Sequence, residues 1–110
     1  MDTIDFLVQG SAQEPYKVTF TRDAEHVAAF CTCPAGKAGK YCKHRSSILD
    51  GDVQGVVSNN HEQVAILAAW LPGTDLAAAR KALKLAEQEF ELAKKAVSSA
   101  KKRVAAVMRK

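Results

Sequence analysis

CTCPAGKAGKYCKH, residues 31–44, is the stretch that decides the fold, and it places three cysteines and a histidine in the pattern Cys31-x-Cys33-x8-Cys42-x-His44. These are the only cysteines of the chain, and His44 is one of three histidines. Three thiolates and one imidazole are the donors of a closed, tetrahedral structural zinc site, whereas a catalytic zinc keeps one position open. The sequence therefore predicts one structural Zn²⁺ bound by Cys31, Cys33, Cys42 and His44.

The residues around the ligands predict how they are presented. Pro34 follows the second cysteine and cannot donate to a strand ladder, so a strand should end at the first pair of cysteines. The residues up to the third cysteine include two glycines and should form a loop. A short helix should begin there, with His44 in its first turn, and Gly51 suits the left-handed position after its end.

This pattern, Cys-x-Cys-Pro followed by a variable loop and Cys-Lys-His, resembles the SWIM-type zinc finger over residues 16–50. The resemblance implies a β-β-α zinc module in which Pro34 and Lys43 belong to the motif. Members of that family are usually accessory modules of larger transposases, chromatin-remodelling ATPases or recombination factors, where they bind DNA or another protein. Those larger domains are not recognisable in this sequence, so the biological context is not carried over.

Other chemistries fit the same residues less well. An odd cysteine count and the lack of a signal-peptide pattern disfavour a structural disulfide. One [2Fe–2S] family shares the spacing of the three cysteines, but its histidine follows the third cysteine by four residues, whereas His44 follows Cys42 by two. The glycine-lysine pairs of the loop do not form a phosphate-binding P-loop, because Tyr41 stands where Ser or Thr is required. We expect no enzyme.

Hydrophobic patterning predicts the elements on either side of the motif. Residues 4–8, 16–22 and 26–30 should form a three-stranded antiparallel meander, with 23–25 as a hairpin connection. Residues 58–60 offer N-cap side chains for a helix over 62–71 that contains Trp70 as a core residue. Pro72 and Gly73 should end that helix, and Thr74 can cap the next. His61 is expected to be solvated and not a further ligand.

The C-terminal segment, 74–110, contains no glycine or proline and predicts one helix of about 35 residues. Apolar residues recur every seven positions and, in a second set, three residues later, which is the pattern of a helix-pairing seam. The side chains of the second set are small and favour close, antiparallel approach of a partner helix. Leu85 and Leu92 lie on another face of the helix. The first set is Leu76, Leu83, Phe90, Val97 and Val104, and the second is Ala79, Ala86, Ala93, Ala100 and Val107.

The predicted fold class is thus α+β. Residues 1–57 form the β-meander with the finger, 58–73 a short helix and turn, and 74–110 a long basic helix. No apolar run reaches the roughly 20 residues of a membrane span, and we expect a cytoplasmic protein, with the nucleus or nucleoid as alternatives. A homo-oligomer or a helix-mediated complex with another protein is expected through the seam.

Charge is polarised along the chain. Residues 1–73 carry six Lys and Arg against eight Asp and Glu, a net of −2, while 74–110 carry ten against four, a net of +6. Basic residues of the finger and of the helix tail therefore predict binding to the phosphates of DNA or RNA. The alternative is an interaction or scaffold protein that uses the long helix, with zinc purely structural. The candidate binding residues are Lys37, Lys40, Lys43, Arg45, Lys94, Lys95, Lys101, Lys102 and Arg103.

Overall fold

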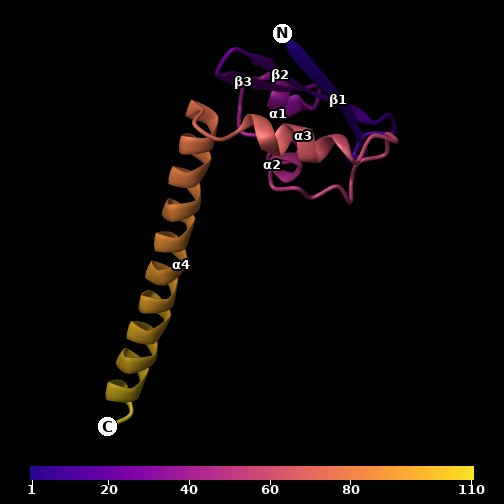
Figure 1. Cartoon of the computed structure of the whole chain (residues 1–110). Coiled ribbons are helices and arrows are strands. Elements are labelled where there is room, and N and C mark those ends of the chain that lie inside the picture. The colour runs from indigo at the N-terminus through magenta and orange to yellow at the C-terminus, as the bar shows by residue number, and fades with distance from the viewer. The chain divides into compact units, whose positions relative to one another are not determined.

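A computed structural model describes the whole chain, residues 1–110 (Figure 1). It has the predicted α+β composition, with a three-stranded antiparallel sheet followed by helices. Contacts divide the chain into two compact units, Met1–Ala77 and Ala78–Lys110. The elements are β1 (Asp2–Val8), β2 (Tyr16–Asp23), β3 (His26–Cys31), α1 (Pro34–Lys37), α2 (Lys43–Leu49), α3 (Gln63–Trp70) and α4 (Asp75–Met108).

The sheet is the predicted meander, in the order β1-β2-β3. Its register pairs Phe6 with Val18 and Phe20 with Ala29. Because side chains alternate between the two faces of a strand, this register gathers the buried apolar side chains of all three strands on one face, while Leu7 and Phe30 are exposed. Phe6 and Phe20 are fully buried and meet edge to face, with ring centroids 6.0 Å apart.

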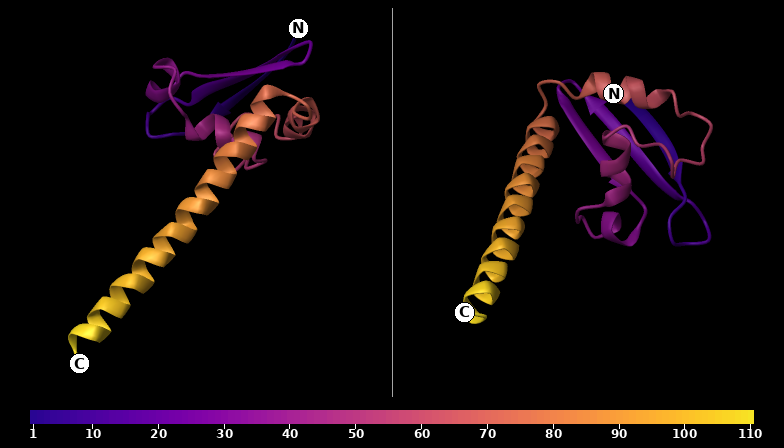
Figure 2. Two further views of the ribbon diagram at one scale, coloured as in Figure 1. Left: turned by 90° about the vertical axis from the view of Figure 1, so that its left-hand side faces the viewer. Right: turned by 90° about the horizontal axis from the view of Figure 1, so that it is seen from below.

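Helices α2 and α3 cover this apolar face (Figure 2). Ile48 of α2 and Leu67 of α3 are almost fully buried against the sheet. Trp70, at the end of α3, is also buried, as predicted for a core residue. Complete burial of a side chain of this size contributes about 2–3 kcal/mol, so these contacts are a major source of stability for the first unit.

Residues 55–60 run beside the open edge of β1, and this changes the role predicted for the polar residues before α3. Ser58 Oγ accepts a hydrogen bond from the Leu7 N–H (3.1 Å), and Asn60 donates its side-chain amide to the Asp5 carbonyl (2.7 Å). The N-cap position is Glu62, which makes no side-chain capping bond. The prediction that residues 58–60 cap α3 was therefore wrong, because these side chains satisfy the unpaired backbone groups of an edge strand.

The predicted end of α2 is confirmed. Gly51 has φ +86°, and its N–H donates to the Ile48 carbonyl while that of Asp52 donates to the Ser47 carbonyl (both 2.9 Å). This pair of bonds is the Schellman motif, which needs a left-handed residue at the position that glycine occupies.

Helix α4 is the long helix that the sequence predicts, with 34 residues. Thr74 caps it, because its Oγ1 accepts from the Ala77 N–H (3.1 Å). None of its residues is buried. Leu76 is half-buried and packs against the core of the first unit, unlike the rest of the predicted seam. Leu83, Phe90, Val97 and Val104 are 42%, 63%, 54% and 53% exposed.

The β2–β3 hairpin contains a strained residue. Ala24 has φ 55°, the left-handed region that costs an alanine about 1–2 kcal/mol, and its side chain is exposed. We expect Ala24→Gly to raise the free energy of unfolding by about 0.5–1 kcal/mol after the added backbone entropy of glycine is subtracted. Urea denaturation of the metal-loaded protein measures this. Glu25→Gly, next to it but without the positive φ, should lower stability, and equal effects of both changes would contradict the strain.

Candidate metal centre

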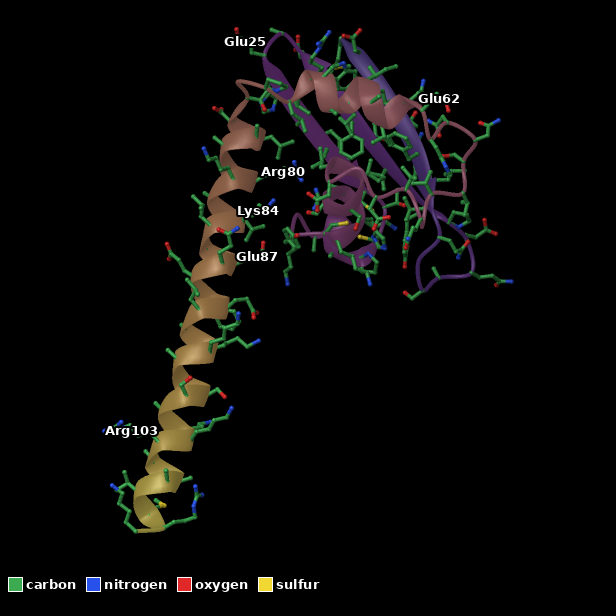
Figure 3. The ribbon with its side chains drawn as sticks, turned by 60° about the horizontal axis from the view of Figure 1, so that its bottom comes forward. Glu25, Glu62, Arg80, Lys84, Glu87 and Arg103 are labelled. Atoms are coloured by element: carbon green, nitrogen blue, oxygen red, sulfur yellow. The ribbon has the colours of Figure 1, made fainter.

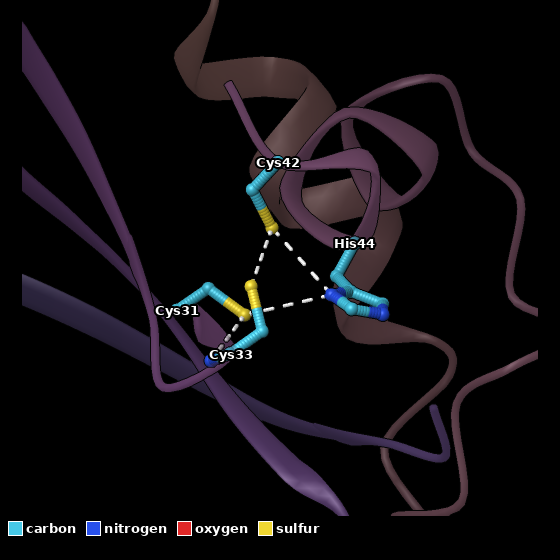
Figure 4. Close-up of side chains that lie close together, drawn as sticks. All are labelled: Cys31, Cys33, Cys42 and His44. Carbon is cyan, nitrogen blue, oxygen red and sulfur yellow. Dashed lines mark hydrogen bonds between the residues drawn. The ribbon is translucent and has the colours of Figure 1, made fainter. Parts of the chain in front are cut away.

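Four ligand side chains come from three neighbouring elements and meet at one point (Figure 4). Cys31 is the last residue of β3, Cys33 caps α1, and Cys42 is the N-cap residue of α2. His44 lies in the first turn of α2, as predicted. The strand ends at the first two cysteines because Pro34 begins a helix.

The geometry of the four donor atoms suits one metal ion. All four lie within 4.8 Å of one another, and the three cysteines are buried. Cys33 Sγ lies 3.4 Å from Cys42 Sγ. His44 presents Nδ1 to the group, 3.8 Å from Cys31 Sγ and 3.5 Å from Cys42 Sγ. Three thiols and an imidazole at these separations form a Cys₃His cluster that can bind a single metal.

The predicted loop between Cys33 and Cys42 contains one turn of helix, α1, and this corrects the sequence analysis. Cys33 Sγ accepts a hydrogen bond from the Gly36 N–H (3.2 Å), so a thiol acts as the N-cap. A Cβ atom at residue 36 would collide with the carbonyl oxygen of Cys31. Glycine is therefore required for the turn to lie this close to β3.

The surroundings shift the pKa values of two of the thiols in opposite directions. Burial raises the pKa of Cys31 to about 12. Burial also acts to raise the pKa of Cys42, but hydrogen bonds from the Arg45 backbone and from the Cys33, Cys31 and His44 side chains outweigh it and lower the value to about 6. Crowded thiols disfavour simultaneous ionisation, so Cys42 is the thiol that ionises most readily, and a bound cation would compensate the charge of the further thiolates.

Two side chains contact the residues of the cluster or the loop between them, and the sequence did not predict either contact. Tyr16 of β2 packs on the His44 ring, with centroids 5.1 Å apart. Arg45 was predicted to bind a partner, but its guanidinium donates to the Ala29 carbonyl (3.0 Å) and to the Lys40 carbonyl. Arg45 thus ties the loop to β3, and its part in partner binding stays a prediction. No sequence signal marks either contact, because both depend on tertiary proximity.

The other predicted residues are not among the four candidate ligands. Lys37, Lys40 and Lys43 are exposed around the cluster, and every basic residue of the α4 tail is exposed. His61 lies outside the cluster, and its Nε2 lies 2.9 Å from the Val56 carbonyl oxygen. None of the helices combines the length and the apolar character that crossing a membrane requires.

Comparison with family models, curated protein sequences and solved structures finds no match for this chain.

Removing one ligand tests the cluster. His44→Ala and, separately, Cys33→Ser should abolish stoichiometric metal binding and lower the melting temperature, because structural metal binding contributes on the order of 10 kcal/mol and is coupled to folding. Elemental analysis and thermal denaturation measure both effects. His26→Ala is the matched control, since His26 is exposed and outside the cluster. Unchanged metal content in the Cys33 variant would remove it from the ligand set.

Proposed function

We propose that this protein is a zinc-binding, non-enzymatic module that binds nucleic acid through its basic residues. The observation that carries the zinc assignment is the geometry of the Cys₃His cluster. A tetrahedral site with Zn–S of about 2.3 Å and Zn–N of about 2.0 Å has S–S and S–N edges of about 3.8 and 3.5 Å. Three of the six separations, 3.4 Å between two sulfurs and 3.5 and 3.8 Å between sulfur and nitrogen, lie within about 0.4 Å of these edges, and all six are within 4.8 Å.

A structural role for the zinc follows from the number of ligands. Four protein donors complete the tetrahedron and leave no position for a water or a substrate. The ion would join the end of β3 to the start of α2 and so stabilise the first unit. Two strands, the cluster and a helix occur in that order in the chain, which supports a SWIM-type finger as the class of this module.

Nucleic-acid binding is supported by the exposure and sign of the surrounding charge. Lys37, Lys40 and Lys43 extend into solvent next to the ligands. The α4 tail after Leu92 carries cations and no acidic residue. Cations at such positions displace counterions from phosphates and bind without base specificity. The tail cations are Lys94, Lys95, Lys101, Lys102, Arg103, Arg109 and Lys110.

A second candidate function is a scaffold or interaction protein, and one observation favours it. The apolar seam of α4 is exposed from Leu83 onward. Such a face indicates a helix partner. The two functions are compatible, because the seam and the most outward-facing cations lie on different sides of the helix.

The identity of the metal is the first test. Protein purified without chelators should contain one zinc per chain and be colourless, because zinc has no visible d–d transitions and the ligand set favours it. Elemental analysis and an absorption spectrum decide this. Stoichiometric iron with visible absorbance would instead indicate an iron–sulfur cluster.

Nucleic-acid binding is tested on the helix tail. Changing Lys95, Lys102 and Arg109 together to Gln should weaken binding to DNA of any sequence, because these cations lie on the side of the helix opposite the seam. The slope of log affinity against log salt should fall by about one unit for each phosphate that the variant no longer binds. Fluorescence anisotropy at several salt concentrations measures both quantities. The matched control changes Arg80, Lys81 and Lys84 to Gln, the same charge in the first half of α4. Absence of salt-dependent binding by the unmodified protein would favour the scaffold function.

A further inference from the structure

The exposed seam of α4 has a definite beginning and end. Leu76 packs against the core of the first unit and is therefore already used. From Leu83 to Val107 the seam residues are exposed, each large one more than 40%. Phe90 is the largest of them, and only the Lys94 ammonium lies over its ring, 5.3 Å from the centroid. The part of the seam that still needs a cover thus extends from Leu83 to Val107.

We propose that a second copy of this chain covers the seam, with the two α4 helices antiparallel. The sizes of the seam side chains favour antiparallel pairing. In a parallel pair, residues of the same seam position face each other, so Phe90 would meet Phe90 while Ala86 and Ala93 would meet their own copies. Alternating large-large and small-small layers cannot keep a constant distance between two helices. Antiparallel pairing sets each alanine against a large residue of the other copy.

The distribution of charge along α4 also favours the antiparallel orientation. Residues 75–92 carry three Lys and Arg against four Asp and Glu, a net of −1, whereas 93–110 carry seven cations and no acid, a net of +7. A parallel pair would place the two strongly basic halves together. An antiparallel pair places each basic half beside the weakly acidic half of the other copy and also aligns the helix dipoles favourably.

The register follows from complete overlap of the exposed seam. If Leu83 of one copy faces Val107 of the other, the two-fold axis passes at residue 95. The layers are then Leu83 with Val107, Ala86 with Val104, Phe90 with Ala100, and Ala93 with Val97, each formed twice by symmetry. Large and small side chains alternate along both helices, which is the arrangement that fills the space between closely spaced helices.

Flanking charges support this register independently of the seam. Residues next to the seam on the same flank face each other in an antiparallel pair, so Glu89 meets Arg103 of the other copy and Glu87 meets Lys101. Neither Glu89 nor Arg103 has an oppositely charged residue three or four positions away in its own helix. Figure 3 shows Glu87 and Arg103 extending from opposite sides of α4, as expected for residues on the two flanks.

One contact in this register is unfavourable. Lys94 lies near the two-fold axis and meets Lys94 of the other copy. Each of these lysines already has a partner in its own helix, because Lys94 Nζ lies 3.4 Å from Glu91 Oε1. Four favourable pairs, two of each kind by symmetry, outweigh this single repulsion.

Charge reversal and rescue test orientation and register together. Sedimentation equilibrium of the full, metal-loaded chain should show a monomer–dimer equilibrium, and Glu89→Lys should raise the dimer Kd about tenfold. Adding Arg103→Glu to Glu89→Lys should restore the dimer, because the pair is rebuilt with its signs exchanged. Gln88→Lys is the control: it adds a positive charge one residue away on the outward side of the helix, outside the antiparallel contact, and should leave the Kd within about twofold.

The alternatives give different outcomes. In a parallel pair Glu89 would face Lys94, so rescue by Lys94→Glu and not by Arg103→Glu would overturn the antiparallel proposal. A trimer or tetramer, or a monomer up to millimolar concentration, would also overturn it. Circular dichroism and metal content of each variant establish that it is folded. These measurements use no nucleic acid, so their outcome is independent of the function proposed above.

Discussion

Convergence of three cysteines and a histidine within residues 31–44 is the constraint on which the first unit depends. Cys31 must end a strand, Cys33 must turn the chain, and Cys42 and His44 must begin a helix, with the four donor atoms all within 4.8 Å of one another. Each thiol is therefore held by local geometry as well as by the core. The metal, once bound, would connect the sheet to the helix that covers it, so loss of the ion should loosen both.

The two compact units are stabilised in different ways. The first contains all the fully buried side chains, and its stability comes from apolar burial supplemented by the cluster. Helix α4 buries none of its residues. It depends on intrahelical hydrogen bonds, on alanine-rich composition and on the Thr74 cap, and 34 residues are enough for such a helix to form. A long helix with an exposed apolar face gains further stability only from a partner.

The proposed pairing of α4 and the proposed binding of nucleic acid would use different faces of the same helix. In the proposed antiparallel register, Lys101 and Arg103 would lie beside the seam and meet carboxylates. Lys95, Lys102 and Arg109 recur every seven residues on the side opposite the seam. A dimer would therefore present two such rows of cations, one on each outer side, and would raise the local concentration of phosphate-binding groups.

Short-range patterns determined much of this protein. The strands, the four ligands, the left-handed Gly51, the Thr74 cap and the length of α4 follow from residues within a few positions of each other, and local chemistry is sufficient to place them. Tertiary structure alone decided four other features. Cys33 turns a predicted loop into α1, Ser58 and Asn60 bond to β1 instead of capping α3, Arg45 ties the loop to β3, and Leu76 leaves the seam for the core. These four outcomes depend on which unsatisfied backbone group or apolar surface lies nearby after folding, and a one-dimensional pattern does not contain that information.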